Sequence, residues 1–542
     1  MRLSINEFKV TEKDKQNPTV LFLLDIIRQQ AEEIEKLKER NNALAAEINT
    51  LKDEINRLKN HPRKPDVKPS TLEEDKKPSQ KGKKPEKRPG SKKRKKTSEI
   101  KIHEDCPIEP TDLPEGARFV RYKDFVVQGI KFEAHNIRYR LKTYQLPDDS
   151  YVTGKLPEHL DGKHFSPELI SFLLYQHYHC HVTQPLLLEQ LHEIGINISK
   201  GQINNILIEN KDKFHEEKNK IISVGLETSS YINVDDTGAR HKGKNGYCTY
   251  IGNELFSWFE STFSKSRINF LKLLRAGRKD YIINPEAIAY MTKNRFPAHI
   301  QNKLVGFMDM TFENDHQWER FLVENGINKE RHIKIITEAA LIGSIVEHGI
   351  SKYLVILSDD AGQFNVLIHA LCWIHAERTI QKIIPYSDEA AADLDNIKEQ
   401  IWSLYQELKR YKENPNKKDK HRINSMFDAI FTSNTHSATL NQALNRLYLN
   451  KDELLLVLHR PDIPLHNNSA ENAIREYVKK RKISGGTRSD TGRRARDTFI
   501  SLKKTCRKLG LSFWQYLNDR VSGLGKTPSL PDLIKARVSK PG

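Results

Sequence analysis

The chain has 542 residues, a formal net charge of +18 and five scattered cysteines. Its length supports three or four domains, and the odd, unclustered cysteines exclude a disulfide framework and fit a reducing compartment. Because no run approaches the roughly 18 apolar residues of a membrane span and the N-terminus lacks the pattern of a signal peptide, we expect a cytoplasmic protein.

A seven-residue repeat runs through residues 23–60. The apolar positions are Ile34, Ile48 and Ile55 with Asn41 at a, and Leu37, Leu44, Leu51 and Leu58 at d. Ile at a with Leu at d favours a parallel two-stranded coiled coil, and one polar a residue fixes its register. Three of the four g-to-e′ pairs are opposite in charge, which agrees with that arrangement. The alternative is a helix packed on its own domain.

Positive charge is concentrated in two places. Residues 61–100 hold fifteen Lys/Arg against six Asp/Glu (+9), and residues 472–510 hold thirteen against three (+10). The first segment is rich in proline and has no core-forming pattern, which predicts a disordered basic linker. Such patches indicate a partner with a phosphate backbone, although solvated surface lysines give the same composition.

Residues 101–157 contain short β-branched and aromatic runs, including 119–122, 125–127 and 139–144, and predict a small β-rich domain. Residues 164–222 read as helical. Within them, a helix beginning at Gln184 leads through Gly195 to Ser199, which is a suitable N-cap for a helix from Lys200 to Ile208.

A helix, a glycine turn and a capped helix form the helix-turn-helix pattern, although any two-helix corner reads the same way. In the second helix, four side chains are able to touch phosphate or bases: Lys200, Gln202, Asn204 and Asn205.

Two apolar runs end at doubled aspartates. Tyr231–Val234 precedes Asp235 and Asp236, and Tyr353–Ser358 precedes Asp359 and Asp360. Short β-branched runs bounded by turn residues predict buried strands. Neighbouring strand residues point to opposite faces, so only one acid of each pair can serve a shared site. Spacing alone does not choose between the members of a pair.

A third acid, Glu471, lies far downstream. As a structural alternative, Glu471 falls at the N3 position of a capping box begun by Asn468, or pairs with Arg475 one turn on. The segment after it is cationic and contains Gly485 and Gly486, a composition suited to a phosphate chain. The candidate phosphate contacts there are Arg475, Lys479, Lys480, Arg481, Lys482 and Arg488.

Three carboxylates pooled by folding suit two Mg²⁺ ions, with Mn²⁺ as a substitute, for in-line attack on a phosphodiester. One acid of each aspartate pair, together with Glu471, would supply the metal ligands. His369, Cys372 and His375 are spaced along one side of an expected helix, but three ligands on one helix make a poor tetrahedron. Packing near the site is favoured over zinc there.

The expected organisation is an α/β catalytic core interrupted by an α-helical insertion. Its regions are 1–62 (N-terminal segment and coiled coil), 63–100 (linker), 101–160 (β-rich), 161–224 (helix-turn-helix-like), 225–375 (first segment of the core, with an unassigned insertion at about 276–350), 376–462 (helical insertion), 463–520 (second segment of the core, with Glu471 and the basic patch) and 521–542 (tail).

The ordered set of motifs resembles the transposases of insertion-sequence family 66, a bacterial DDE group. The segments that carry the resemblance are Val234–Arg240 with Gly243–Tyr247, Ser264–Arg267, Ser358–Phe364, Cys372–Arg378, Asn467–Arg475 with Arg481-Lys482, and Ser501-Leu502. The likeness covers most of residues 160–520. It departs at 101–157, where many members have a cysteine-bearing zinc-finger-like segment and this chain has only Cys106.

The resemblance implies an RNase H-like core whose acids and metal ligands are Asp235, Asp359 and Glu471. It favours the first residue of each aspartate pair, with Asp236 and Asp360 as fallbacks. It also implies dependence on Mg²⁺ and binding to the ends of a mobile element. It also implies a bacterial, nucleoid-associated protein that cuts element ends and joins them to target DNA. A homodimer or larger assembly through the coiled coil is expected, with helper proteins from the same element for some members. The alternatives are a non-catalytic DNA-binding protein derived from a transposase, and a nuclease of the same fold that never joins strands.

Overall fold

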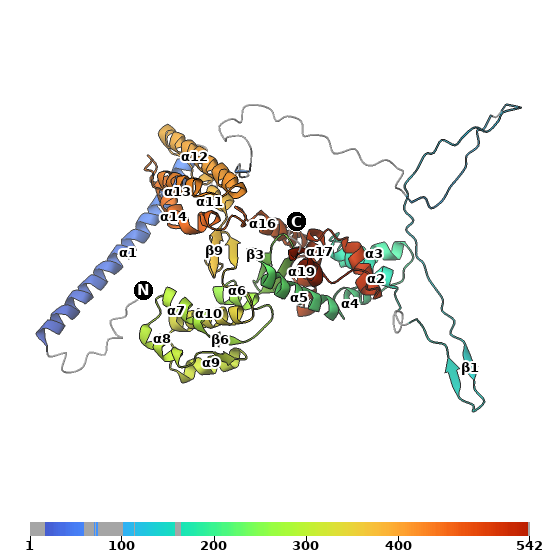
Figure 1. Cartoon of the computed structure of the whole chain (residues 1–542), viewed down its shortest axis with the longest axis horizontal. Coiled ribbons are helices and arrows are strands. Elements are labelled where there is room, and N and C mark those ends of the chain that lie inside the picture. The colour runs from blue at the N-terminus through green and yellow to red at the C-terminus, as the bar shows by residue number, and fades with distance from the viewer. Residues whose placement is uncertain are drawn as a thin grey trace. The chain divides into compact units, whose positions relative to one another are not determined.

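The computed structural model describes residues 17–58, 70, 72–73, 101–112, 114–157 and 164–539 (Figure 1). The chain divides into two compact units. One combines Met1–Ser79 with Ile374–Lys451, and the other combines Gln80–Trp373 with Asp452–Gly542. No helix in the described ranges is long and apolar enough to cross a membrane.

The first unit begins with α1 (Pro18–Leu58), a single helix of 41 residues. The heptad pattern therefore forms the helix that it predicts. The side chains of Ile34, Leu37, Leu44, Ile48 and Leu51 are each about half exposed. Because these apolar side chains are not buried within one chain, the a/d stripe of α1 is open to a partner helix.

The first unit also holds the helical insertion. Its helices are α11 (Trp373–Gln381, whose first residue belongs to the second unit), α12 (Asp388–Glu413), α13 (Lys417–Phe431) and α14 (Ala438–Leu449). The short helix α15 (Lys451–Leu454) begins at the last residue of this unit and otherwise belongs to the second unit. Along α12, buried Leu394, Ile397, Ile401, Leu404 and Leu408 follow the 3–4 spacing of one helix face. That face packs on α13, which in turn packs on α14.

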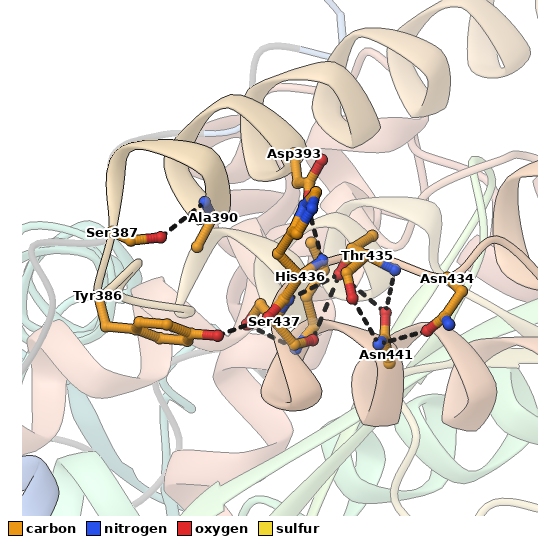
Figure 2. Close-up of polar contacts among 10 residues, drawn as sticks. Tyr386, Ser387, Ala390, Asp393, Asn434, Thr435, His436, Ser437 and Asn441 are labelled. Carbon is orange, nitrogen blue, oxygen red and sulfur yellow. Dashed lines mark hydrogen bonds and ion pairs between the residues drawn. The ribbon is translucent and has the colours of Figure 1, made fainter.

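Polar contacts tie the loops at one end of these helices (Figure 2). Tyr386 donates its hydroxyl hydrogen to the carbonyl of His436 at 2.5 Å, and the backbone N–H of His436 donates to Asp393 of α12 at 2.8 Å. The hydrogen bonds from His436 lower the pKa of Asp393. Ser387 and Ser437 cap α12 and α14 at the same end.

The second unit is built on a mixed five-stranded sheet with the order β5-β4-β3-β8-β9. Its strands are β3 (Tyr231–Gly238), β4 (Tyr247–Gly252), β5 (Ser257–Thr262), β8 (Val355–Ser358) and β9 (Ile368–Leu371). The first three form an antiparallel meander, and β8 and β9 continue it in parallel with β3. The expected strands before both aspartate pairs are confirmed.

Helices cover both faces of this sheet. Ile232, Val234 and Ile356 belong to the large core shared with α5 (Asp212–Thr228), α6 (Arg267–Leu274) and α10 (Glu330–Glu347). On the opposite face, Tyr250 and Phe259 pack against Ala473 and Tyr477 of α16 (Asn468–Ser484). The observed class is therefore α/β, as expected.

The free edge of β5 is covered by α17 (Asp490–Lys508). Three side chains spaced one helical turn apart accept hydrogen bonds from alternate backbone N–H groups of β5: Thr505 from Ser257 at 3.1 Å, Ser501 from Phe259 at 2.9 Å and Asp497 from Ser261 at 2.8 Å. An uncovered edge would present these donors to other chains. Here α17 satisfies them with its own side chains.

The segment at 164–222 is helical as expected. It contains α2 (Pro167–Tyr178), α3 (Gln184–Glu193), α4 (Lys200–Ile208) and the start of α5. Gly195 between α3 and α4 has a φ of +84°, which favours glycine. Ser199 caps α4 in a reciprocal capping box with Gln202, so both ends of the predicted second helix are confirmed.

Residues 276–350 form a lobe around α10. Its elements are β6 (Tyr281–Ile283), α7 (Pro285–Lys293), α8 (Ala298–Val305), β7 (Met310–Phe312) and α9 (Asp315–Glu324), which gather as yellow-green elements in Figure 1. Tyr281 and Trp318 stack at its centre with ring centroids 5.1 Å apart. The C-terminal helices are α18 (Phe513–Ser522) and α19 (Leu530–Val538).

The β-rich expectation for residues 101–157 is largely wrong. The described residues of this stretch contain one hairpin, β1 (Thr143–Gln145) with β2 (Tyr151–Thr153), and no strand at 119–122 or 125–127. Phe125 is 90% exposed. Strand propensity reflects a fit to a half-buried surface, and these residues have no such surface in one chain. The linker expectation at 63–100 lies outside the described residues, apart from 70, 72 and 73.

Candidate active site

Asp235 lies in β3, and Asp359 lies one residue beyond the end of the neighbouring strand β8. β3 and β8 are parallel, and their register pairs Asn233 with Leu357. Asp235 and Asp359 each lie two residues further on. Both carboxyl groups therefore lie toward the C-terminal ends of the two parallel strands.

Strand alternation identifies which acid of each pair shares a face. Ile232, Val234 and Ile356 point into the core on the α5 and α10 side. Because side chains alternate along a strand, Asp235 points to the opposite face, where α16 packs. The same alternation, continued one residue past β8, places Asp359 on that face as well.

Asp235 lies in a mostly buried and strongly negative environment. Burial raises the pKa of its carboxyl to about 7, and the nearby carboxylates of Asp359, Asp236 and Glu471 add to that effect. Asp359 and Glu471, from separate regions of the sequence, thus each lie within electrostatic reach of Asp235. Asp235 also accepts a hydrogen bond from the N–H of Asp236 at 2.7 Å.

Glu471 stands in the first turns of α16. Its carboxylate pairs with Arg475 one turn on, at 3.1 Å, and its side chain is 13% exposed whereas that of Arg475 is 66% exposed. The predicted ion pair between Glu471 and Arg475 is therefore confirmed. The capping-box alternative is wrong, because the N-cap residue is Asn467 and makes no side-chain cap hydrogen bond.

Asn467 is a site residue that sequence reasoning missed. It is 1% exposed, and its side chain accepts from the amide of Asn233 and donates to the carbonyl of Val234, both at 2.8 Å. Its backbone N–H donates to the sulfur of Cys372 at 3.1 Å. One asparagine thereby ties the start of the Glu471 helix to the strand of Asp235. The sequence signal was the doubled Asn467-Asn468, which also fits a simple cap.

The second acid of the first pair has another partner. Gln363, in the loop after β8, donates to Asp236 at 2.8 Å. Burial raises the pKa of Asp236, while that hydrogen bond and the charge of Lys265 oppose the shift. Arg267 donates to the carbonyl of Gly362 in the same loop at 2.7 Å. Asp236 therefore positions the loop that carries Asp359.

Ser358 links His369 to the backbone of Asp359. Ser358 donates to the carbonyl of Asp359 at 2.5 Å and lies 2.8 Å from His369 Nε2. Since the serine hydroxyl has one hydrogen, His369 Nε2 is the donor in the second contact. Burial lowers the pKa of His369 to about 4, which keeps the ring neutral at physiological pH.

The single helix expected through His369, Cys372 and His375 is wrong. His369 lies in β9, and α11 begins only at Trp373. Among the residues that the structure describes, no three His, Cys, Asp or Glu side chains are grouped closely enough to hold a metal ion. Asp235, Asp359 and Glu471 are thus not grouped as metal ligands in the described residues, and Glu471 pairs with Arg475 instead.

The candidate phosphate contacts differ in their access to solvent. Arg475, Lys479, Lys482 and Arg488 are exposed. Arg481 is half-buried and donates to the carbonyl of Gly238 at the end of β3.

Lys480 is the exception, because it is 4% exposed and donates to the carbonyl of His177 in α2 at 2.8 Å. Burial lowers its pKa to about 7. The prediction that Lys480 contacts phosphate is therefore wrong. The sequence alone did not show which face of α16 packs against the rest of the unit.

On α4, Lys200, Gln202 and Asn205 are exposed. Gln202 accepts from the N–H of Ser199 at 3.2 Å, and Asn204 accepts from Gln184 at 3.3 Å. The exposed face of α4 therefore carries the polar side chains that were expected there.

Comparison with known proteins identifies a family and one relative. Residues 338–495, which span Asp359 and Glu471, match the Transposase IS66 family. The chain is also 43% identical over 303 residues to the uncharacterized protein y4jO of Sinorhizobium fredii (strain NBRC 101917 / NGR234), an alignment that covers 56% of this chain and 94% of the relative. Membership of a transposase family implies that the chain binds DNA. The chain belongs to the Transposase IS66 family.

Proposed function

We propose that this chain is a DDE transposase that cuts DNA at the ends of its mobile element and joins the cut ends to target DNA. The observation that carries the proposal is the gathering of three carboxyl groups on the α16 face of the sheet. Asp235 lies in β3, Asp359 directly follows the adjacent parallel strand β8, and Glu471 lies on the helix whose start Asn467 ties to β3. The mixed sheet with helices on both faces supports the RNase H-like core.

The donor set suits Mg²⁺. Carboxylate oxygens are the ligands that Mg²⁺ prefers, and a divalent cation would neutralise the crowded negative charge that raises the pKa of Asp235. Asp235, Asp359 and Glu471 would hold the ions once Glu471 turns away from Arg475. Two bound Mg²⁺ ions supply an activated nucleophile and stabilise the leaving oxygen of an in-line displacement.

The chain's own residues do the remaining work. Exposed Lys479, Lys482 and Arg488, with Arg475 and Arg481, hold the DNA backbone beside the acids. Release of Glu471 frees Arg475 for a phosphate. The exposed face of α4 recognises the element's ends, and α1 pairs two subunits so that two ends are brought together.

The test uses matched substitutions within each aspartate pair. A plasmid carrying the DNA that flanks the gene is incubated with Mg²⁺ and each full-length variant. Asp235→Asn, Asp359→Asn and Glu471→Gln are expected to lose cleavage by at least a thousandfold while they keep DNA affinity, as removal of a metal ligand requires. Asp236→Asn and Asp360→Asn are the controls and keep measurable cleavage. Full activity of Asp359→Asn would refute its assignment.

A second assay separates joining from cutting. Pre-cut ends with free 3′-hydroxyls are supplied with a target plasmid, and joined products are expected in Mg²⁺. Cleavage without any joined product would favour a nuclease of the same fold.

A further inference from the structure

Three described residues of the basic linker lie against the helical insertion of the first unit. Leu72 is 1% exposed, although the segment around it has almost no other large apolar side chain. Ser70 and Glu73 make side-chain hydrogen bonds to α11 and α12. A linker that acts only as a spacer would not bury its one leucine.

Residues of α12 contact both the backbone of Leu72 and the side chain of Glu73. The carbonyl of Leu72 accepts from Gln406 at 2.9 Å, which holds the backbone in place. Glu73 accepts from the hydroxyl of Tyr405 and pairs with Lys409 at 3.4 Å. Tyr405 and Lys409 are four residues apart in α12, and Gln406 and Lys409 are three apart, so all three side chains lie on one side of that helix.

The other end of the contact lies on α11. Ser70 donates its hydroxyl hydrogen to Glu377, which is 5% exposed. Ser70 also accepts from the N–H of Leu72 at 3.3 Å, which bends the segment around the leucine. The docking surface, defined as Glu377, Tyr405, Gln406 and Lys409, therefore fits a polar–apolar–acidic segment.

The sequence of the linker supports the same conclusion independently. Within residues 61–100, the large aliphatic side chains are Val67, Leu72 and Ile100. Three of the six acids of that stretch follow Leu72 directly, at Glu73, Glu74 and Asp75. An acidic patch with one leucine is out of place in a segment of net charge +9, but it complements a surface that presents Lys409.

We propose that Ser70, Leu72 and Glu73 form a docking motif that fastens the N-terminal arm of this chain to its own helical insertion. Docking fixes the linker to the insertion at Ser70, Leu72 and Glu73. Eleven residues, 59–69, separate the end of α1 from Ser70, and twelve residue steps span at most about 40 Å. The motif therefore holds the insertion within that reach of the end of the coiled coil. It does not depend on DNA cleavage.

The experiment is a zero-length carbodiimide cross-link in the full-length protein. The carboxylate of Glu73 and the ammonium of Lys409 lie 3.4 Å apart, so the reagent is expected to join them. Peptide mass spectrometry measures the yield. Leu72→Asp is expected to lower the yield at least tenfold, whereas Val67→Asp, the same change elsewhere in the linker, leaves it unchanged. Equal yields in the two variants would overturn the proposal.

Two further measurements exclude simpler explanations. Glu73→Lys and Lys409→Glu should each speed hydrogen exchange in α12 at residues 405–409, and the double exchange should restore the protection. Unrestored protection would contradict recognition by charge.

Mixing ¹⁴N- and ¹⁵N-labelled protein tests whether the motif docks on its own chain. Docking within one chain predicts cross-links between peptides of the same isotope, and mixed-isotope cross-links would overturn it.

Discussion

α1 and the α16–α17 pair are both amphipathic, but their apolar and polar groups find partners differently. In α1 the repeating Ile and Leu side chains remain about half exposed in one chain. In α16 and α17 the inward faces are buried on the sheet, and side chains such as Asn467 and Asp497 hydrogen-bond to strands more than 230 residues away. The partner of α1 would repeat its own sequence, whereas the partners of α16 and α17 are set by the whole fold.

The largest expected effect is on assembly. Ile34→Asp with Leu37→Asp places charge at neighbouring a and d positions, and burial of unpaired charge in the seam would cost several kcal/mol. Light scattering should then give the mass of a single chain, where the parent protein gives a dimer. Gln29→Asp with Lys36→Asp, at outward positions, should leave the dimer intact. A parent protein that is monomeric would contradict the coiled coil.

The next largest effect is at Asn467. Asn467→Ala removes the partners of Asn233 and of the carbonyl of Val234, both buried, and is expected to cost about 2–4 kcal/mol. Because these groups flank Asp235, cleavage should fall more than tenfold with little change in DNA affinity. Asn468→Ala, the adjacent substitution, should change stability by under about 0.5 kcal/mol. Equal effects at the two positions would mean that Asn467 is only a component of the helix start.

Asp497 tests the edge of the sheet. Asp497→Ala leaves the buried backbone N–H of Ser261 without its acceptor and removes one of the two partners of the Ser261 hydroxyl. The free energy of unfolding, measured with urea, is expected to fall by about 1–3 kcal/mol. Burial raises the pKa of Asp497, so some of this cost is offset by removal of a buried charge. A stabilised variant would show that desolvation outweighs the ladder of hydrogen bonds.

The smallest expected effect separates two adjacent lysines. Lys479→Met should lower the slope of log affinity against log salt by about one, as loss of one phosphate contact predicts, and Lys480→Met should not. The pKa of Lys480 is lowered to about 7 from its ordinary value near 10.5. The unfolded chain therefore binds the proton more tightly, and the parent protein should gain stability over Lys480→Met as pH rises from 7 to 10. Thermal melts across that range measure it.

What the sequence predicted follows the same division. α1 and α4 were predicted closely because heptad spacing and the Ser199 cap are local signals. The two strands that end at aspartates were predicted because their composition is strongly β-branched. The residues alone did not choose between Asp235 and Asp236, because that choice depends on which face of β3 packs against α16, and no local pattern contains that information.

The wrong expectations all depended on long-range structure. Phe125 belongs to a run with strand propensity but has no sheet to join. His369 and His375 fall in different elements because β9 ends between them. Lys480 reads as one of four consecutive cations, and only the packing of α16 shows that it points inward.

Direct measurement of metal binding tests the central claim. Mn²⁺ is titrated into the full-length protein with its end DNA and followed by electron paramagnetic resonance. Two bound ions per chain are expected in the parent protein and in Asp236→Asn and Asp360→Asn, with loss of binding in Asp235→Asn, Asp359→Asn and Glu471→Gln. Undiminished binding in the latter three, or its loss only in the first two, would contradict a site formed by Asp235, Asp359 and Glu471.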